Sequence, residues 1–280
     1  MINIPSSRRF FLKSACALGA LAGLPSALAH GGHARVGLQL YTVRDMASKN
    51  LLHTLEHVAA LGYKDMEFAG YFDYSVQTLR RHLDVLGLAA PSAHIPLTAF
   101  QSDTDKVIDQ ALVMGHQYLV MPYLTDEQRQ GGIDAFKRLA EYLNGVGEKC
   151  RQNGLFLAYH NHDFEFFETD GQLPYDVLLE VPSEHLLMEM DLYWTTKAGY
   201  DPVAYFEQDP GRFPLWHVKD MDAQGNFADV GSGTIDFERI FAHRHTAGLQ
   251  HGFVERDVTD NLERTLTASF VNAEALMAKQ

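Results

Sequence analysis

Short apolar runs alternate with longer amphipathic stretches from Val36 to the end of the chain. The runs have the length of buried strands, and the stretches repeat apolar positions at three- and four-residue spacing, as helices do. The predicted strands are Val36–Leu40, Asp65–Ala69, Ala90–Ala93, Tyr118–Met121, Leu155–His160, Leu186–Asp191, Leu215–Val218 and Gly252–Glu255. The predicted helices are Leu51–Leu61, Val76–Leu86, Asp103–Met114, Gly132–Asn153, Pro174–Glu180, Pro202–Asp209, Phe237–Ala247 and Thr259–Ala278.

Eight successive strand–helix units predict an all-parallel sheet, and eight strands are the number that closes a (β/α)₈ TIM barrel. Glycine follows several of the helices, for example in Leu61-Gly62 and Met114-Gly115, where it suits a left-handed cap. The alternative is an open doubly wound sheet. That fold places a Gly-rich turn after its first strand, and Leu40-Tyr41-Thr42-Val43-Arg44 is not such a turn. We therefore expect one barrel domain over residues 30–280.

Residues 1–29 have the order of a secretory signal. The pair Arg8-Arg9 precedes Phe10 and Phe11, a moderately apolar run follows, and Ala27-Leu28-Ala29 supplies small residues for cleavage. This order predicts a twin-arginine signal peptide, and the run is too short to span a bilayer. The predicted product is a periplasmic or secreted protein that uses the twin-arginine export machinery as a precursor and has no membrane attachment afterwards.

The chain is acidic, with a formal net charge of −13. The segment predicted to be removed carries three basic residues and no acid, so the remainder is more acidic still. Such a surface repels phosphate backbones, which argues against a nucleic-acid partner. Only Cys150 remains after the predicted cleavage, so no internal disulfide is expected.

Polar residues gather where the predicted strands end, the position of active sites in barrels of this kind. They are Gln39 with Tyr41, Glu67, His94, His160 with His162 and Glu165, Asp191, His217 with Lys219, and Glu255. His160, Asp191, His217 and Glu255 make a mixed nitrogen and oxygen set on neighbouring strands. That set suits Mn²⁺, Co²⁺, Fe²⁺ or Zn²⁺ better than Ca²⁺, with Mg²⁺ as a further candidate.

Proton transfer is the second chemistry that the pattern indicates. Side chains alternate along a strand, so Lys219 shares a face with His217, and His162 shares one with His160. We expect His162, Lys219, Glu255 and His160 to be catalytic, with one of the two histidines binding metal while the other acts as a base. Gln39, Tyr41, Glu67, His94, Glu165 and Trp194 are expected to contact the substrate. The turn Gly231-Ser232-Gly233-Thr234 is a weak candidate for anion binding.

Together these motifs resemble the xylose isomerase-like barrel superfamily, the sugar phosphate isomerase/epimerase group. The resemblance extends from about Val36 to the C-terminal helix and rests on Val36–Arg44, Glu67–Gly70, Tyr159-His160-Asn161-His162, Met190-Asp191, Trp216–Asp220, Gly231–Asp236 and Val254-Glu255. It implies one divalent metal held by Glu, Asp, His and Glu on strands five to eight. The last three match Asp191, His217 and Glu255. His160 stands where the family has its first glutamate, with His162 and Glu165 as alternatives for that place.

In the family's epimerases the first and last glutamates are two bases on opposite faces of a sugar carbon. A histidine at the first place favours proton removal from one side instead. The sequence therefore predicts a metal-dependent isomerase, dehydratase or lyase acting on a keto-sugar, polyol or 3-keto-glycoside. A sugar 3-epimerase or a hydroxypyruvate isomerase-like enzyme is the alternative, and a non-catalytic periplasmic sugar- or metal-binding protein is the alternative of another class. The small-molecule carbohydrate, the metal and any homo-oligomer stay open at this point.

Overall fold

Eight parallel strands form a closed barrel in the computed structural model, which describes residues 35–278. The strands are β1 (Val36–Gln39), β2 (Asp65–Phe68), β3 (Ala89–His94), β4 (Tyr118–Met121), β5 (Phe156–His160), β6 (Leu187–Asp191), β7 (Leu215–Val218) and β10 (His251–Val254). The last strand closes the ring against the first, with Val36 opposite Gly252. The predicted (β/α)₈ TIM barrel is confirmed, and each of its eight strands matches a predicted one within two residues at either end.

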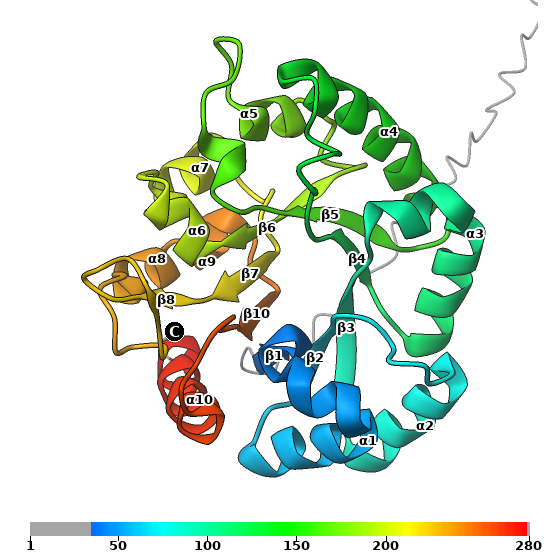
Figure 1. Cartoon of the computed structure of the whole chain (residues 1–280), viewed down its shortest axis with the longest axis vertical. Coiled ribbons are helices and arrows are strands. Elements are labelled where there is room, and N and C mark those ends of the chain that lie inside the picture. Colours follow the sequence, from blue (N-terminus) through cyan, green and yellow to red (C-terminus); the bar gives the residue numbers. More distant parts are fainter. Residues whose placement is uncertain (1–34, 279–280) are drawn as a thin grey trace, which may run out of the picture. The chain divides into compact units, whose positions relative to one another are not determined.

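Helices surround the ring of strands (Figure 1). They are α1 (Arg44–Leu61), α2 (Val76–Leu86), α3 (Leu97–Met114), α4 (Ile133–Gln152), α5 (Pro174–Leu179), α6 (Leu192–Lys197), α7 (Pro202–Gln208), α8 (Phe237–Ala242), α9 (Arg244–Ala247) and α10 (Leu262–Ala278), with short 3₁₀ turns at Leu40–Val43 and Phe164–Phe166. In α2, Val76, Leu79 and Leu83 are buried. Their spacing places them on one helical face, which packs inward.

Two helices begin earlier than the pattern predicts, and both are kinked. Asn50 interrupts α1 and Asp103 interrupts α3 with extended backbone. Each side chain then accepts a backbone N–H three residues later, Asn50 from His53 and Asp103 from Lys106. This is N-cap behaviour in the middle of a helical segment. The predicted starts at residues 51 and 103 therefore mark the second half of each helix.

A short helix and a hairpin of two short strands were not predicted from the sequence. Helix α6 follows β6 without a loop, and β8 (Asp220–Met221) pairs with β9 (Phe227–Ala228) in a hairpin after β7. Six residues are too few to show a helical period, and two-residue strands show no alternation. The helix follows the carboxyl end of β6, and the hairpin follows the carboxyl end of β7.

The barrel interior changes character along its axis. Its apolar part contains Tyr118, Val120, Ala158, Leu215 and Phe253. Residues further along the same strands and on the same face are polar, for example His160 two positions after Ala158 and His217 two positions after Leu215. The apolar layer supports a polar layer at the carboxyl ends of the strands.

None of the helices within residues 35–278 combines the length and the apolar character needed to cross a bilayer. The predicted signal peptide, residues 1–29, lies outside the residues described by the structure.

Candidate functional site

Four side chains from neighbouring strands converge at the polar end of the barrel. His160, Asp191, His217 and Glu255 each present one nitrogen or oxygen atom, and the four atoms lie within 4.8 Å of one another. The Nε2 of His160 is 3.4 Å from the Oδ2 of Asp191, and the Nδ1 of His217 is 2.9 Å from the Oε2 of Glu255. All four are buried. The structure thus brings together the four residues predicted as metal ligands.

Neighbouring groups hold these donor atoms in position. The Nδ1 of His160 lies 3.0 Å from the carbonyl oxygen of Pro122, which leaves Nε2 to face Asp191. The two oxygens of the Asp191 carboxylate have different partners. Oδ1 accepts the backbone N–H of Trp194 at 2.9 Å and so caps α6, while Oδ2 faces His160 and His217. Outer contacts of this kind orient the ligands of metal sites.

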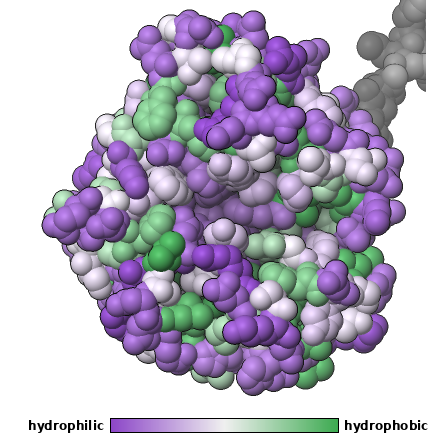
Figure 2. All heavy atoms as spheres, viewed as in Figure 1, coloured by the Kyte–Doolittle hydropathy of each residue, from purple (hydrophilic) through white to green (hydrophobic). Residues whose placement is uncertain are grey.

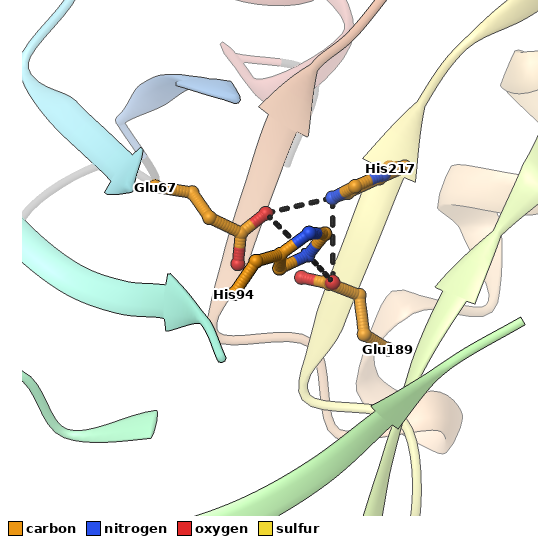
Figure 3. Close-up of side chains that lie close together, drawn as sticks. All are labelled: Glu67, His94, Glu189 and His217. Carbon is orange, nitrogen blue, oxygen red and sulfur yellow. Dashed lines mark hydrogen bonds and ion pairs between the residues drawn. The ribbon is translucent and has the colours of Figure 1, made fainter. Parts of the chain in front are cut away.

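A second group lies on the opposite edge of the His217 ring. The side chains of Glu67, His94 and Glu189 gather around its Nε2 (Figure 3). The Oε2 of Glu67 is 2.7 Å from this nitrogen, and the Oε2 of Glu189 is 3.3 Å from it. His94 donates toward or accepts from Glu189 at 2.8 Å, according to its tautomer.

Glu189 was missed by the sequence reasoning, although a signal for it exists. It stands two positions before Asp191 on β6, so both side chains point into the barrel. Burial raises the pKa of Glu189 well above its ordinary value, and nearby Glu67 raises it further. Burial also tends to raise the pKa of Glu67, but the nearby His94 and His217 outweigh this effect and lower that pKa to about 2.

Lys219 is a buried cation beside the first group. Its Nζ lies 2.9 Å from the Oε2 of Glu255, 2.9 Å from the Oδ1 of Asp257 and 3.5 Å from the Oδ2 of Asp191. Burial lowers the pKa of Lys219, but Glu255, Asp191 and Asp257 more than compensate, so the pKa is raised above its ordinary value. The expected shared face of Lys219 and His217 is observed.

The glycine turn after β9 does not present free amides to a ligand. The carboxylate of Asp220 accepts the backbone N–H groups of Gly231 and Gly233 at 2.9 Å. An internal carboxylate therefore occupies the place that the sequence suggested for an external anion. Asp220 is engaged in this way, and within residues 35–278 the ion pairs of Lys219 are with Asp191, Glu255 and Asp257.

Aromatic rings surround His162, which lies beside the group formed by His160, Asp191, His217 and Glu255. Its ring centroid lies 5.0 Å from that of Tyr123, 5.6 Å from Phe164 and 5.5 Å from Trp194. The His160 ring is 4.8 Å away. Within the described part of the chain, the buried Nδ1 of His162 and Nε1 of Trp194 have no hydrogen-bond partner. The face of the barrel drawn in Figure 2 is hollowed near its centre.

The other residues predicted to contact substrate lie in different settings. Gln39 is buried and donates to the Oε2 of Glu67 at 2.8 Å, so it positions that carboxylate. Tyr41 is 45% exposed and lies beside Arg44. Glu165 is not brought into either group: its carboxylate accepts from the hydroxyl of Tyr159 at 2.6 Å and from the backbone N–H of His162 at 2.8 Å. The side chain of Tyr159 points away from the barrel interior, so the Glu165 carboxylate bonded to it also lies outside the barrel interior.

The chain is similar in sequence or in fold to several known proteins. It is 24% identical over 236 residues to an inosose dehydratase of Clostridium beijerinckii, covering 70% of this chain and 78% of that one. A solved sugar phosphate isomerase/epimerase from Parabacteroides distasonis superposes with a TM-score of 0.75 at 24% identity, covering 94% of this chain and 99% of the other. The IolI protein, solved with a bound zinc atom, superposes with a TM-score of 0.70 at 15% identity; the superposition covers 88% of this chain and 98% of the other.

The family model described as xylose isomerase-like TIM barrel matches residues 55–255. The chain belongs to the xylose isomerase-like TIM barrel family.

Proposed function

We propose that this protein is a divalent-metal-dependent dehydratase or lyase of keto-sugars. It removes a proton next to the carbonyl of a keto-sugar, a keto-polyol or a 3-keto-glycoside, and a hydroxyl or glycosidic oxygen leaves the neighbouring carbon. One observation carries the proposal: the four-donor group of His160, Asp191, His217 and Glu255 lies beside two further proton-transfer residues, His162 and Lys219. The similarity to an inosose dehydratase supports this choice over the related isomerisation.

The donor set fits a transition-metal ion. It offers two imidazole nitrogens and two carboxylate oxygens, a set typical of Mn²⁺, Co²⁺, Fe²⁺ or Zn²⁺. The two carboxylates balance the charge of one divalent ion. The contact between His160 Nδ1 and the Pro122 carbonyl also favours a proton on that nitrogen, which leaves the Nε2 lone pair facing the group. When bound, the ion supplies a Lewis acid that binds the substrate carbonyl oxygen and stabilises negative charge developing there.

Two side chains beside the donor set divide the proton transfers. His162 presents an Nδ1 that has no partner among residues 35–278, so it is available to accept the proton from the carbon next to the carbonyl. The C–H electrons form the new double bond, and the C–O bond on the neighbouring carbon breaks. Lys219 is held charged by its acidic neighbours and donates a proton to the leaving oxygen.

Two alternatives differ from this proposal in ways that can be measured. A two-base epimerase needs a second base on the opposite face, and Glu255, the carboxylate available, is already bonded to His217 and Lys219. A binding protein without turnover needs the donor set but neither His162 nor Lys219. We also propose periplasmic or secreted location through the predicted twin-arginine signal, which supports a free or glycosidic sugar over a sugar phosphate.

Metal analysis and substrate screening test the proposal together. Wild-type protein is loaded with Mn²⁺, Co²⁺ or Zn²⁺ and compared with Asp191→Ala and His160→Ala, and with Glu184→Ala as an exposed control. We expect bound metal and turnover of inososes or 3-keto-glycosides in the wild type and the control. The two site variants lose the ion of this group and turnover. Metal binding without turnover of any keto-sugar would favour the binding protein, and metal content unchanged in both site variants would remove the site from the proposal.

A further inference from the structure

We propose that Glu67, His94, Glu189 and His217 form a second divalent-cation site. This site lies on the opposite edge of the His217 ring from the first and uses Nε2, whereas the first uses Nδ1. The function proposed above requires one ion, so the second site goes beyond it. His217 would then bridge two ions as an imidazolate, its ring proton having been released to solvent when the second ion binds.

The spacing of the donor atoms fits a common ion. Nitrogen and oxygen atoms bound at about 2.1 Å to one ion lie roughly 3 to 3.4 Å apart in octahedral or tetrahedral geometry. The Nε2 of His217 is 2.7 Å from the Oε2 of Glu67 and 3.3 Å from the Oε2 of Glu189. The Nε2 of His94 is 3.4 Å and 2.8 Å from the same two oxygens. All four donor atoms lie within 4.8 Å of one another, as candidate ligands of one ion.

The second observation is a carboxylate oxygen without a partner. Glu189 is fully buried, and its Oε1 has no hydrogen bond within the described chain. Figure 3 shows both oxygens of Glu189 directed toward the space bounded by Glu67, His94 and His217. A buried polar atom left unpaired is costly, and a shared cation removes that cost.

Charge leads to the same conclusion. Glu67 and Glu189 are both inaccessible to solvent, and no lysine or arginine of residues 35–278 is paired with either. Lys219, the buried lysine beside the first group, is paired with Glu255, Asp257 and Asp191. Two buried carboxylates need a compensating charge, and without an ion the imidazoles of His94 and His217 are the groups paired with them within the described chain. Two divalent ions and Lys219 would offset the four carboxylates of the two groups and Asp257, and would leave the charge of a bridging His217 imidazolate as the net charge.

His94 gives the second site its contact with solvent. The side chain of His94 is 11% exposed, whereas those of Glu67, Glu189 and His217 are fully covered. His94 ends β3, at the carboxyl end where the first group also lies. The second site is therefore reached from the same side as the first.

The competing interpretation gives Glu67 an indirect role. A proton on the Nε2 of His217 would be donated to Glu67, and Glu67 would then orient His217 as a ligand of the first ion. That arrangement leaves Glu189 and His94 without a function and the oxygen of Glu189 unpaired. The two interpretations differ in the number of ions bound.

Metal stoichiometry separates them. Purified protein is stripped, reloaded with Mn²⁺ and analysed as wild type, Glu189→Gln, His94→Gln and Asp191→Asn, with thermal melting as the check on folding. We expect two ions per chain in the wild type, one in each single variant, and magnetic coupling between the two Mn²⁺ ions in wild-type spectra only. Glu189→Gln and His94→Gln both remove a donor of the second site, so the test still decides if one of these variants fails to fold.

The failure of this inference can be told from the failure of the proposed function. One ion in the wild type that is retained in Glu189→Gln and His94→Gln but lost in Asp191→Asn overturns the second site and leaves the first. One ion that is retained in Asp191→Asn but lost in Glu189→Gln and His94→Gln supports the second site and removes the first. No ion in correctly folded wild type overturns both.

Discussion

The side-chain nitrogen of Lys219 lies 2.9 Å from the Oε2 of Glu255, and the same carboxylate oxygen lies 2.9 Å from the Nδ1 of His217. One oxygen atom therefore joins a buried ammonium group to the group of four predicted metal ligands. Glu255 follows β10, and both Lys219 and His217 come from β7 or directly after it. In the proposed function His217 and Glu255 bind the ion and Lys219 donates the proton, so this oxygen atom contacts residues of both roles.

Replacing Lys219 should stop turnover without removing the metal. We expect Lys219→Gln to lower kcat by about 10²- to 10⁴-fold, the usual contribution of a positioned acid or base. Metal content should stay at the wild-type level because Lys219 is not among the four donors. Lys197→Gln is the matched control, since Lys197 lies 5.0 Å from the Trp194 ring and Lys219 lies 5.4 Å from it. Equal losses of kcat in both variants would contradict the role of Lys219.

The two histidines of β5 and its following loop should respond in different ways. His162→Asn should lower kcat by about 10²- to 10⁴-fold and keep the metal, because the ring that accepts the proton is lost. His160→Asn should lose the metal as well, because its Nε2 faces Asp191. Steady-state kinetics and metal analysis on both variants check this. Metal loss in His162→Asn with metal retention in His160→Asn would show that His162 is the ligand and that His160 is not.

Glu165 should make the folded protein less stable as pH rises. Burial raises the pKa of Glu165 from an ordinary 4.5 to about 8, against hydrogen bonds from Tyr159 and His162 that lower it. A raised pKa means that the folded state favours the protonated form. This contribution to stability is therefore complete below about pH 4.5 and is lost as pH rises toward 8.

Thermal melting between pH 5 and 8 tests this prediction. Glu165→Gln, which carries no ionisable group, should show a flatter dependence of Tm on pH than wild type and should be relatively more stable at pH 8. The exposed neighbour Glu168 supplies the control variant Glu168→Gln. Parallel curves for wild type and Glu165→Gln would show that Glu165 stays ionised in the fold.

Two glycines of α4 should give opposite effects on stability. A methyl group on Gly147 would collide with the carbonyl oxygen of His185, whereas one on Gly145 would meet nothing within 4 Å. Gly147→Ala should therefore cost about 1 to 3 kcal/mol as overpacking. Gly145→Ala should gain up to about 1 kcal/mol from helix propensity. Chemical denaturation measures both, and a stable Gly147→Ala variant would show that α4 can move away from His185.

The strands and the first group of polar residues could be predicted because their signals are local. Apolar runs of strand length precede His160, Asp191, His217 and Glu255, and a parallel barrel brings successive strand ends together. The order of these residues along the chain therefore predicted their neighbourhood in space. The kinks at Asn50 and Asp103 were not predicted because a polar residue within a periodic stretch is also the usual sign of a helix start.

The second group could not be assembled from the same signals. Glu189 stands inside an apolar strand, where alternation gives it the same inward direction as Asp191 but does not say which residues of other strands it meets. The partners of Glu189 come from β2, β3 and β7, which are distant in the sequence. Glu165 shows the reverse difficulty: it follows a strand end closely, but the hydroxyl of Tyr159 holds its carboxylate on the outer side of the barrel wall.

The pairing of β10 with β1 has a consequence for the order in which the molecule can be completed. During synthesis the first strand emerges long before residues 251–254, and until they arrive the ring has two open edges. Glu255 comes directly after that final strand. A ribosome-bound or prematurely terminated chain that ends before β10 therefore has neither a closed wall nor the fourth donor, and all four donors of the proposed ion are present only in a chain that extends through Glu255.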